Sequence, residues 1–63
     1  MQNFYRVYAK FEGQKRFKPL DMATGSQVTN LIHATMIPET HLGILKMIIR
    51  DNPETEFRIE KIN

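Results

Sequence analysis

Residues 4–11 alternate between two kinds of side chain, and this period of two constrains the fold more than any other feature of the sequence. One set is apolar throughout and comprises Tyr5, Val7, Ala9 and Phe11. The other set combines cations with aromatic rings and comprises Phe4, Arg6, Tyr8 and Lys10. Such alternation is typical of a strand with one buried face and one solvated face. The chain is therefore predicted to begin with an amphipathic strand.

A turn and a second strand are expected to follow, so that residues 4–20 form a β-hairpin. Gly13 can adopt a positive φ without a Cβ clash, which places the turn at Glu12–Gly13. A three-residue loop sets Val7 opposite Phe17, whereas a two-residue loop mixes the two faces. We expect the three-residue loop because it keeps the apolar side chains together. It also predicts one basic-aromatic face made of Arg6, Tyr8, Lys10, Arg16 and Lys18.

The chain has 63 residues and no cysteine, which predicts a single small domain spanning residues 1–63. A chain of this length buries only about 60% of its unfolded surface, and it has no disulfide or thiolate-bound metal to support it. Its stability must come from an efficient core, from a partner or from a second copy. We see no secretory signal and no apolar run of membrane-spanning length, which predicts a cytoplasmic protein without membrane association.

The net charge of +2 is small, but the charges are unevenly distributed. Within residues 1–20 the bases outnumber a single acid, Glu12, whereas residues 51–63 contain more acids than bases. This asymmetry predicts one positive surface and one surface of mixed charge.

Residues 28–37 are compatible with either a strand or a helix. In a strand, one face would contain Ile32, Ala34 and Met36, and the other would contain Leu31, His33, Thr35 and Ile37. In a helix, an apolar stripe would run through Val28, Leu31, Ile32, Thr35 and Met36. The β-branched side chains in this segment favour the strand. Both interpretations remain open, and the strand is the one that enters the predicted fold.

Residues 38–50 are predicted to form one amphipathic helix. Pro38 suits the first helical position, and Glu39 suits the first turn, where the helix dipole favours an acid. Asn52 and Pro53 are expected to end the helix. Its apolar stripe consists of Leu42, Leu45, Ile48 and Ile49, with Ile44 at the margin.

The assembled prediction is an α+β fold of order β-β-β-α-β, in which one helix covers one face of an antiparallel-dominated sheet. Residues 55–62 alternate again and are expected to form the last strand, parallel to the first after a right-handed crossover. The expected core consists of Tyr5, Val7, Phe11, Phe17, Ile32, Ala34, Met36, Leu42, Leu45, Ile48, Ile49, Phe57 and Ile59.

Two resemblances to known groups of proteins rest on these segments. A YRVYAKF…KRFK hairpin followed by TNLIHATMI and a short helix resembles small uncharacterised proteins of bacterial phages and mobile elements. Those proteins have no assigned activity. The stretch FYRVYAKFEGQKRFK, followed by a third strand and a helix, is similar to the arm-type DNA-binding domain of tyrosine recombinases, whose sheet enters the major groove. That resemblance implies a groove-reading role for Arg6, Tyr8, Arg16 and Lys18. The chain departs from it by adding the strand 55–62.

The basic-aromatic face predicts a small binding module whose partner is nucleic acid, held chiefly through phosphate contacts. The alternative interpretation of this face is a solvated sheet surface whose lysines and arginines discourage edge pairing. A second functional hypothesis is a protein-interaction or homodimerising module that uses an apolar patch. That patch would contain Phe4, Tyr8, Leu31, Ile37 and Ile62.

Catalysis is not expected, because no nucleophile, base and acid are spaced in a known arrangement. The two histidines, His33 and His41, match no metal-binding motif, and no cysteine assists them. We therefore predict a non-enzymatic protein with no metal and no cofactor.

Overall fold

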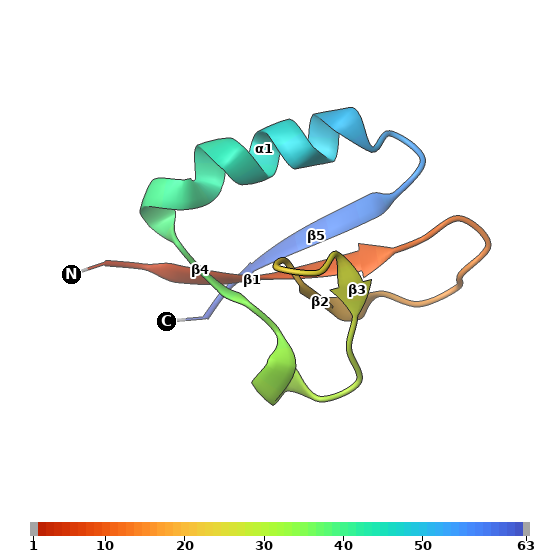
Figure 1. Ribbon diagram of the computed structural model, residues 1–63, viewed down its shortest axis with the longest axis horizontal. Coiled ribbons are helices and arrows are strands. Elements are labelled where there is room, and N and C mark those ends of the chain that lie inside the picture. Colours follow the sequence, from red (N-terminus) through yellow and green to blue (C-terminus); the bar gives the residue numbers. More distant parts are fainter. Residues whose placement is uncertain (1, 63) are drawn as a thin grey trace.

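A computed structural model describes residues 2–62 and shows a five-stranded antiparallel sheet with one α-helix packed on one face (Figure 1). The elements in chain order are β1 (Phe4–Lys10), β2 (Lys18–Asp21), β3 (Ser26–Gln27), the 3-10 helix η1 (Leu31–His33), β4 (Met36–Pro38), the 3-10 helix η2 (Glu39–His41), α1 (Leu42–Asp51) and β5 (Glu56–Lys61). The predicted α+β class, with strands, then a helix, then a strand, is confirmed. Within residues 2–62, no helix is long and apolar enough to cross a membrane.

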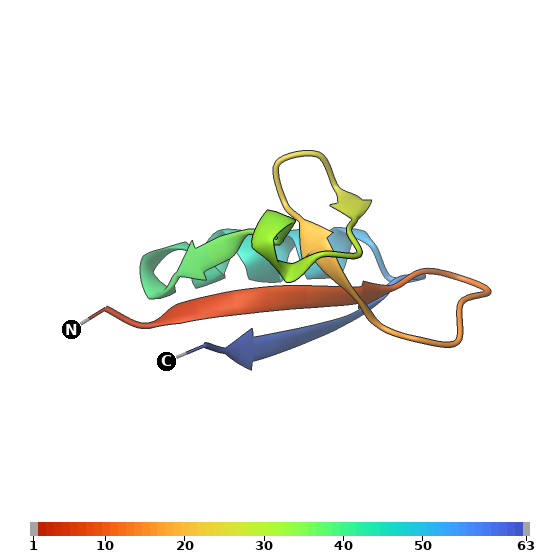
Figure 2. The ribbon, with the colours of Figure 1, turned by 90° about the horizontal axis from the view of Figure 1, so that it is seen from below.

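β1 is the central strand of the sheet. One edge pairs along its length with β5, from Tyr5 opposite Lys61 to Lys10 opposite Glu56. The other edge pairs with β4 near its start and with β2 near its end, and β3 pairs outside β2. In Figure 2, β5 forms one border of the sheet and α1 lies behind it. The helix therefore connects two strands that lie on opposite sides of β1.

The predicted direction of the last strand is wrong, because β5 runs antiparallel to β1. The prediction assumed that residues 28–37 form one strand parallel to β1. In the structure the chain reverses once more between β3 and β4, so β4 runs antiparallel to β1. The helix then returns the chain, and β5 takes the same direction as β4.

The register between β1 and β2 also differs from the prediction. The pairs are Tyr8 with Pro19 and Ala9 with Lys18, because the loop extends through residues 11–17. Within it, the expected turn at Glu12–Gly13 is present, and Gly13 has φ of 86°. The backbone N–H of Phe11 donates to Gln14 Oε1 at 2.8 Å, which helps to hold the longer loop. Consequently Leu20, rather than the predicted Phe17, is buried in the core from this arm.

Residues 28–37 contain only the first two residues of β4, so the predicted continuous strand is wrong, and the alternative α-helix is absent. The Asn30 side chain accepts a hydrogen bond from the backbone N–H of Ile32 at 3.0 Å and starts η1 instead. This turn breaks the alternation assumed for a strand. Ile37 lies opposite Tyr5 and is buried, whereas Met36 lies opposite Arg6 and is exposed. Ile32 is 80% exposed, so its predicted place in the core is wrong, as is that of Met36.

The core lies between α1 and the sheet and is small. Its buried cluster consists of Val7, Ala9, Leu20, Ile37 and Leu45, with Phe11, Met22, Leu42, Ile49 and Phe57 partly buried against it. The prediction is confirmed for Val7 and Leu45 but is wrong for Ile59, which remains exposed. The accessible surface is 4642 Å², against about 4,200 Å² expected for a folded chain of this mass. Several large apolar side chains, among them Ile32, Ile44 and Met47, remain exposed.

The helix begins four residues later than predicted. Pro38 belongs to β4, opposite Phe4, and Glu39 starts η2 rather than α1. The predicted end at Asn52 is confirmed, since its backbone N–H bonds to Ile49 O at 3.3 Å and its side-chain amide donates to Ile48 O at 2.7 Å. These bonds satisfy carbonyl groups that the end of a helix leaves open.

Substitution by alanine is expected to have opposite effects on the free energy of unfolding at Gly43 and at Gly13. Gly43 lies inside α1, and nothing lies within 4 Å of the place that a Cβ would take, so Gly43→Ala will raise the free energy of unfolding by about 1 kcal/mol. Gly13 has a positive φ, so Gly13→Ala will lower it by about 1–2 kcal/mol. Urea denaturation of both variants measures the two changes. Equal signs would contradict the assignment of one glycine to a helix and the other to a left-handed turn.

The start of β1 is tied to η2 by a cluster around Glu39. Asn3 Nδ2 and Tyr5 Oη each donate to Glu39 Oε1 at 3.1 Å. The bonds from Asn3 and then Tyr5 lower the pKa of Glu39, and the bond to Glu39 raises the pKa of Tyr5. The carboxylate therefore stabilises the fold above the ordinary pKa of glutamate, and this contribution is lost as the pH falls through the lowered value. The contribution of Tyr5 is complete below the ordinary pKa of tyrosine and is lost as the pH rises through the raised value.

We expect Glu39→Gln to lower the pKa of Tyr5, because the variant removes the carboxylate that accepts the hydrogen bond of the phenol and whose charge disfavours tyrosinate. The chain has two tyrosines, so the measurement uses a Tyr8→Phe background in which Tyr5 titrates alone. Tyrosinate absorbance is followed through alkaline pH with and without Glu39→Gln. An unchanged midpoint would show that the Glu39 bond has no influence on the phenol in solution.

Candidate nucleic-acid interface and apolar groove

The open face is the side of the sheet away from α1, and it carries alternate residues of β1 and β5. The register sets Arg6 opposite Glu60, Tyr8 opposite Arg58 and Lys10 opposite Glu56. Each glutamate of β5 thus faces a cation of β1. Cross-strand neighbours of opposite charge attract each other, so the open face neutralises part of its own charge.

Two predicted phosphate-binding residues, Arg6 and Lys10, are engaged within the protein. Lys10 Nζ lies 2.8 Å from Glu56 Oε2, and Arg6 Nη1 lies 3.9 Å from Glu60 Oε1. Their side chains are only 25% and 18% exposed, respectively. Binding a phosphate through either residue requires breaking a pair with a carboxylate. The open face is therefore a weaker phosphate surface than the sequence alone indicates.

Arg58 is held by aromatic rings rather than by a carboxylate. Its guanidinium carbon lies 5.5 Å from the ring centroids of both Tyr8 and Phe17. Lys10 Nζ lies 5.1 Å from the same Phe17 ring. Cation–π contacts of this kind orient a cation without cancelling its charge. Phe17, predicted to be in the core, instead organises two cations at the end of the sheet.

The five residues of the predicted basic-aromatic face do not all lie on one face of the sheet. Arg6, Tyr8 and Lys10 do share the open face. Lys18 lies opposite Ala9, whose side chain is buried against the helix side, so Lys18 belongs to the other side of the sheet. Arg16 lies in the loop and on neither face of a strand. The single docking plane is therefore wrong, because the loop is longer than three residues.

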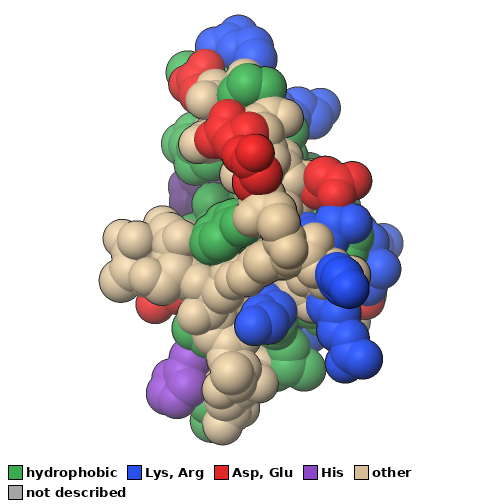
Figure 3. All heavy atoms as spheres, turned by 90° about the vertical axis from the view of Figure 1, so that its right-hand side faces the viewer, with side chains coloured by type: hydrophobic (Ala, Val, Ile, Leu, Met, Phe, Trp, Pro, Cys, Tyr) green, Lys and Arg blue, Asp and Glu red, His purple; other side chains and the backbone are tan. Residues whose placement is uncertain are grey.

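The structure brings a different set of cations together at the end of the sheet where the β1–β2 loop lies. We call this set the basic end; it consists of Lys10, Lys15, Arg16, Lys18 and Arg58. Figure 3 faces this end and shows the blue Lys and Arg side chains gathered on one side of it. Within residues 2–62, Lys15, Arg16 and Lys18 form no ion pair, and all three are exposed. Their charge is available to a ligand.

Two members of the basic end, Lys15 and Arg58, were not among the predicted binding residues. Lys15 lies in the loop, and the expected short loop left room only for residues of the strands. Arg58 lies on β5, whereas all the predicted nucleic-acid-binding residues belong to the first hairpin. The signal that could have found Lys15 is the local run KRFK, residues 15–18, in which three cations surround one aromatic ring.

The predicted apolar patch is divided by the structure. Ile37 is buried in the core and cannot contact a partner. Phe4 and Ile62 are neighbours, since the backbone N–H of Ile62 donates to Phe4 O at 2.9 Å. Leu31 is exposed on η1, and Tyr8 contacts Glu60 and Arg58. The assignment of Ile37 to the apolar patch is therefore wrong, because the 3-10 turn reverses which side chains of the following strand face the core.

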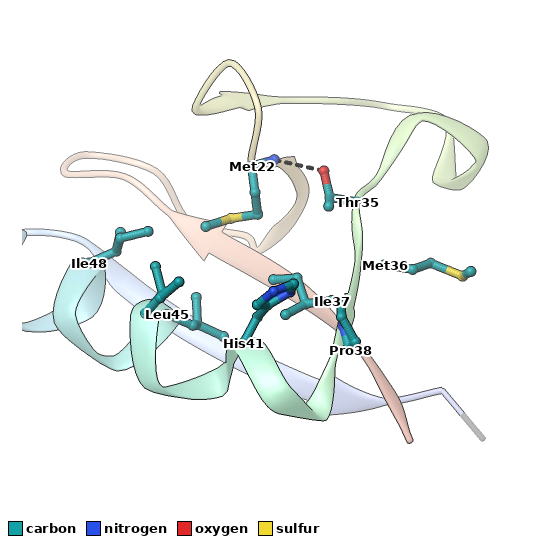
Figure 4. A pocket seen from close by; sticks show the side chains of 9 residues that line it. Met22, Thr35, Met36, Ile37, Pro38, His41, Leu45 and Ile48 are labelled. Atoms are coloured by element: carbon teal, nitrogen blue, oxygen red, sulfur yellow. Dashed lines mark hydrogen bonds between the residues drawn. The ribbon is translucent and has the colours of Figure 1, made fainter. Parts of the chain in front are cut away.

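Another apolar surface lies between α1 and β4. It is a groove of about 490 Å³ lined by Met22, Thr35, Met36, Ile37, Pro38, His41, Ile44, Leu45 and Ile48. Figure 4 shows Ile37 and Leu45 at its floor, Met22 and Ile48 at one end, and Met36 pointing away. Thr35 Oγ1 accepts a hydrogen bond from the Met22 backbone N–H at 2.9 Å, which joins two walls. The lining contains no Lys, Arg, Asp or Glu, so the groove suits an apolar ligand.

Residues 2–62 contain no group of three His, Cys, Asp or Glu side chains that could hold a metal ion. His41 lines the groove, whereas His33 lies on η1.

The fold and surfaces define a small α+β domain with a central β1, a single helix, a basic end and an apolar groove. Comparison of the chain with protein-family models, with curated proteins and with solved structures finds no match. The resemblances to phage or mobile-element proteins and to the arm-type domain of tyrosine recombinases therefore stay predictions.

Proposed function

We propose that this protein is a nucleic-acid-binding module that holds the phosphate backbone with its basic end. The observation that carries the proposal is that Lys15, Arg16 and Lys18 are exposed and form no ion pair within residues 2–62. Cations that a protein does not neutralise itself gain most from replacing the counterions of a polyanion.

The arrangement of Arg58 and Phe17 supports the same function. Arg58 keeps its full charge while the rings of Tyr8 and Phe17 hold it in place. A positioned guanidinium donates to phosphate oxygens in a fork that a flexible lysine cannot form. The exposed loop cations attract the phosphate backbone, and Arg58 orients the phosphate group that it binds.

The nearby acids limit the size of the site. Glu56 pairs with Lys10, and Glu12 lies in the same loop as Lys15. Subtracting these two acids from the five cations of the basic end leaves a local charge of +3. Such a site covers a few phosphates and reads no bases, so we expect weak binding that depends little on sequence.

Fluorescence anisotropy with a labelled mixed-sequence single strand and duplex tests this function. We expect binding to both at low salt, with log K falling against log salt at a slope of about −2.7 to −3.6 for the duplex, as three to four neutralised phosphates require. A smaller slope is expected for the single strand. No binding at protein concentrations up to about 10⁻⁴ M, the weak limit of non-specific association, would refute the proposal.

A second candidate function is capture of an uncharged, apolar segment of a partner protein in the groove between α1 and β4. The observation that favours it is that Ile44, which is 59% exposed, lines a groove that contains no Lys, Arg, Asp or Glu side chain. Contiguous exposed apolar surface of this kind marks a site of interaction with a partner. This function replaces the predicted patch with a surface on the other side of the sheet.

The dye Nile red, which is neutral and apolar, tests whether the groove accepts an apolar ligand. We expect the native protein to enhance its fluorescence and Ile44→Glu to remove most of that enhancement, because a carboxylate then stands in the groove wall. The matched control is Ile32→Glu, since Ile32 is exposed but lies outside the groove. Equal losses for the two variants would contradict binding in the groove.

A further inference from the structure

The outer edge of β5 is the longest unpaired strand edge in the structure. β5 pairs with β1 through six residues, and no strand within residues 2–62 pairs with its other side. Figure 2 shows β5 at the border of the sheet, away from β2, β3 and β4. An edge of this kind presents backbone N–H and C=O groups that another strand can join.

The side chains of β5 restrict the choice of partner. On the open face β5 presents Glu56, Arg58 and Glu60, and on the helix side it presents Phe57, Ile59 and Lys61. Ile59 is 39% exposed although it lies beside the buried Val7. A strand that joins this edge should therefore supply an apolar residue opposite Ile59 and the opposite charges beside it.

We infer that β5 pairs with β5 of a second copy of this chain, antiparallel and about a two-fold axis at Ile59. In this register Ile59 faces Ile59 of the second copy, and Arg58 faces Glu60 on both sides of the axis. Both apolar side chains lie on the helix side, and both charge pairs lie on the open face. The interface is self-complementary, as a two-fold axis requires.

The neighbouring registers that keep each residue on its own face are excluded by charge. A shift of two residues in one direction sets Arg58 against Arg58 and Glu56 against Glu60. The opposite shift sets Glu60 against Glu60. Like charges directly opposite each other destabilise strand pairing. A shift by one residue moves every side chain of the incoming strand to the wrong face. Among the registers within two residues of the axis at Ile59, only the inferred one remains.

The small core gives an independent reason for a second copy. The chain has no disulfide and buries few residues completely, and oligomerisation is one of the ways in which such small domains gain stability. The dimer continues the sheet across the axis, with the two basic ends at opposite ends of the joined strands. Arg58 belongs to both the basic end and the inferred pairing, whereas Ile59 and Glu60 lie outside the basic end. Variants at Ile59 and Glu60 therefore test the pairing separately from the proposed function.

Analytical ultracentrifugation of charge variants tests the inferred pairing. We expect the natural chain to form a dimer. Arg58→Glu or Glu60→Arg should each raise the dissociation constant of the dimer at least tenfold, because each variant sets two pairs of like charges across the axis. An equimolar mixture of the two variants should dimerise again, since every changed charge then faces its opposite. A monomeric natural chain, variants that dimerise as well as the natural chain, or a mixture that stays monomeric would each overturn the inference.

A cysteine placed on the axis gives a second test that does not alter any charge. The sequence contains no cysteine, so Ile59→Cys introduces a single thiol that faces itself across the two-fold axis. Directly opposed residues of antiparallel strands lie within the range of Cα separations that a disulfide spans. We expect Ile59→Cys to cross-link under mild oxidation and Ile62→Cys, three residues from the axis, to remain monomeric on a non-reducing gel. No cross-link at residue 59, or equal cross-linking at both positions, would refute the axis.

Discussion

Replacing Leu45 with alanine will lower the free energy of unfolding by about 3 kcal/mol, within the range of about 2–5 kcal/mol found for buried leucines. Leu45 is 2% exposed and is the only residue of α1 that is buried in the core cluster. Truncation leaves a cavity between the helix and β1 that surrounding side chains cannot fill without moving. A domain of this size has only about 3–9 kcal/mol of stability, so this change removes a third of it or more.

Urea denaturation followed by far-ultraviolet circular dichroism measures this change, with Met47→Ala as the matched control. Met47 lies two residues further along the same helix and is exposed. We expect the control to change stability by less than about 0.5 kcal/mol, as surface substitutions usually do. Equal destabilisation by the two variants would mean that α1 packs on the sheet through another face.

The second large effect is expected from removing the free cations of the β1–β2 loop together. The triple variant Lys15→Gln, Arg16→Gln and Lys18→Gln should weaken nucleic-acid binding at low salt by at least about tenfold, and should make the salt slope less negative by up to about 2.7. The reason is that each lost cation neutralises one phosphate fewer. Anisotropy titrations across a range of salt concentrations give both quantities.

A control triple variant separates this local effect from the change in net charge. Lys46→Gln, Arg50→Gln and Lys61→Gln also remove three positive charges, so each triple variant changes the net charge from +2 to −1. The control residues lie on α1 and at the far end of β5 from Lys10. We expect the control to keep most of the slope. If both triple variants lose binding equally, net charge rather than the basic end accounts for it.

The strands at the two ends of the chain could be predicted because their side chains alternate. Val7 and Phe57 both lie on the helix side in the structure, as their positions in the alternating pattern indicate. A hydrophobic period is a local property, and the burial of one face enforces it wherever the strand ends up in the sheet. For the same reason the stripe of Leu42, Leu45 and Ile49 identified the face of the helix that meets the core.

Residues 28–37 could not be predicted because local and tertiary preferences disagree there. The β-branched residues favour a strand, but Asn30 bonds to the backbone of Ile32 and starts a 3-10 turn. Three residues of turn are enough to reverse which side chains face the core. Ile37 therefore lies in the core rather than in the predicted patch, and Met36 is exposed rather than buried.

The sequence predicted which kinds of residues form the candidate site, but not where on the fold they lie. The sequence indicated that cations and aromatic rings lie together near the first hairpin, and Phe17 does contact Lys10 and Arg58. It could not show that glutamates of β5 pair with Arg6 and Lys10, because those contacts join residues about fifty positions apart. Only pairing between β1 and β5 brings these charges within reach of each other.

By itself, the sequence determined the amphipathic strands, the helix and its buried stripe, and the α+β class, because each depends on the period of neighbouring side chains. The tertiary structure alone decided the direction of β5, the register of β2 and which cations remain free. Those properties depend on where a loop ends and on which strand lies beside another, and residues far apart in the chain fix them together through the burial of one shared core.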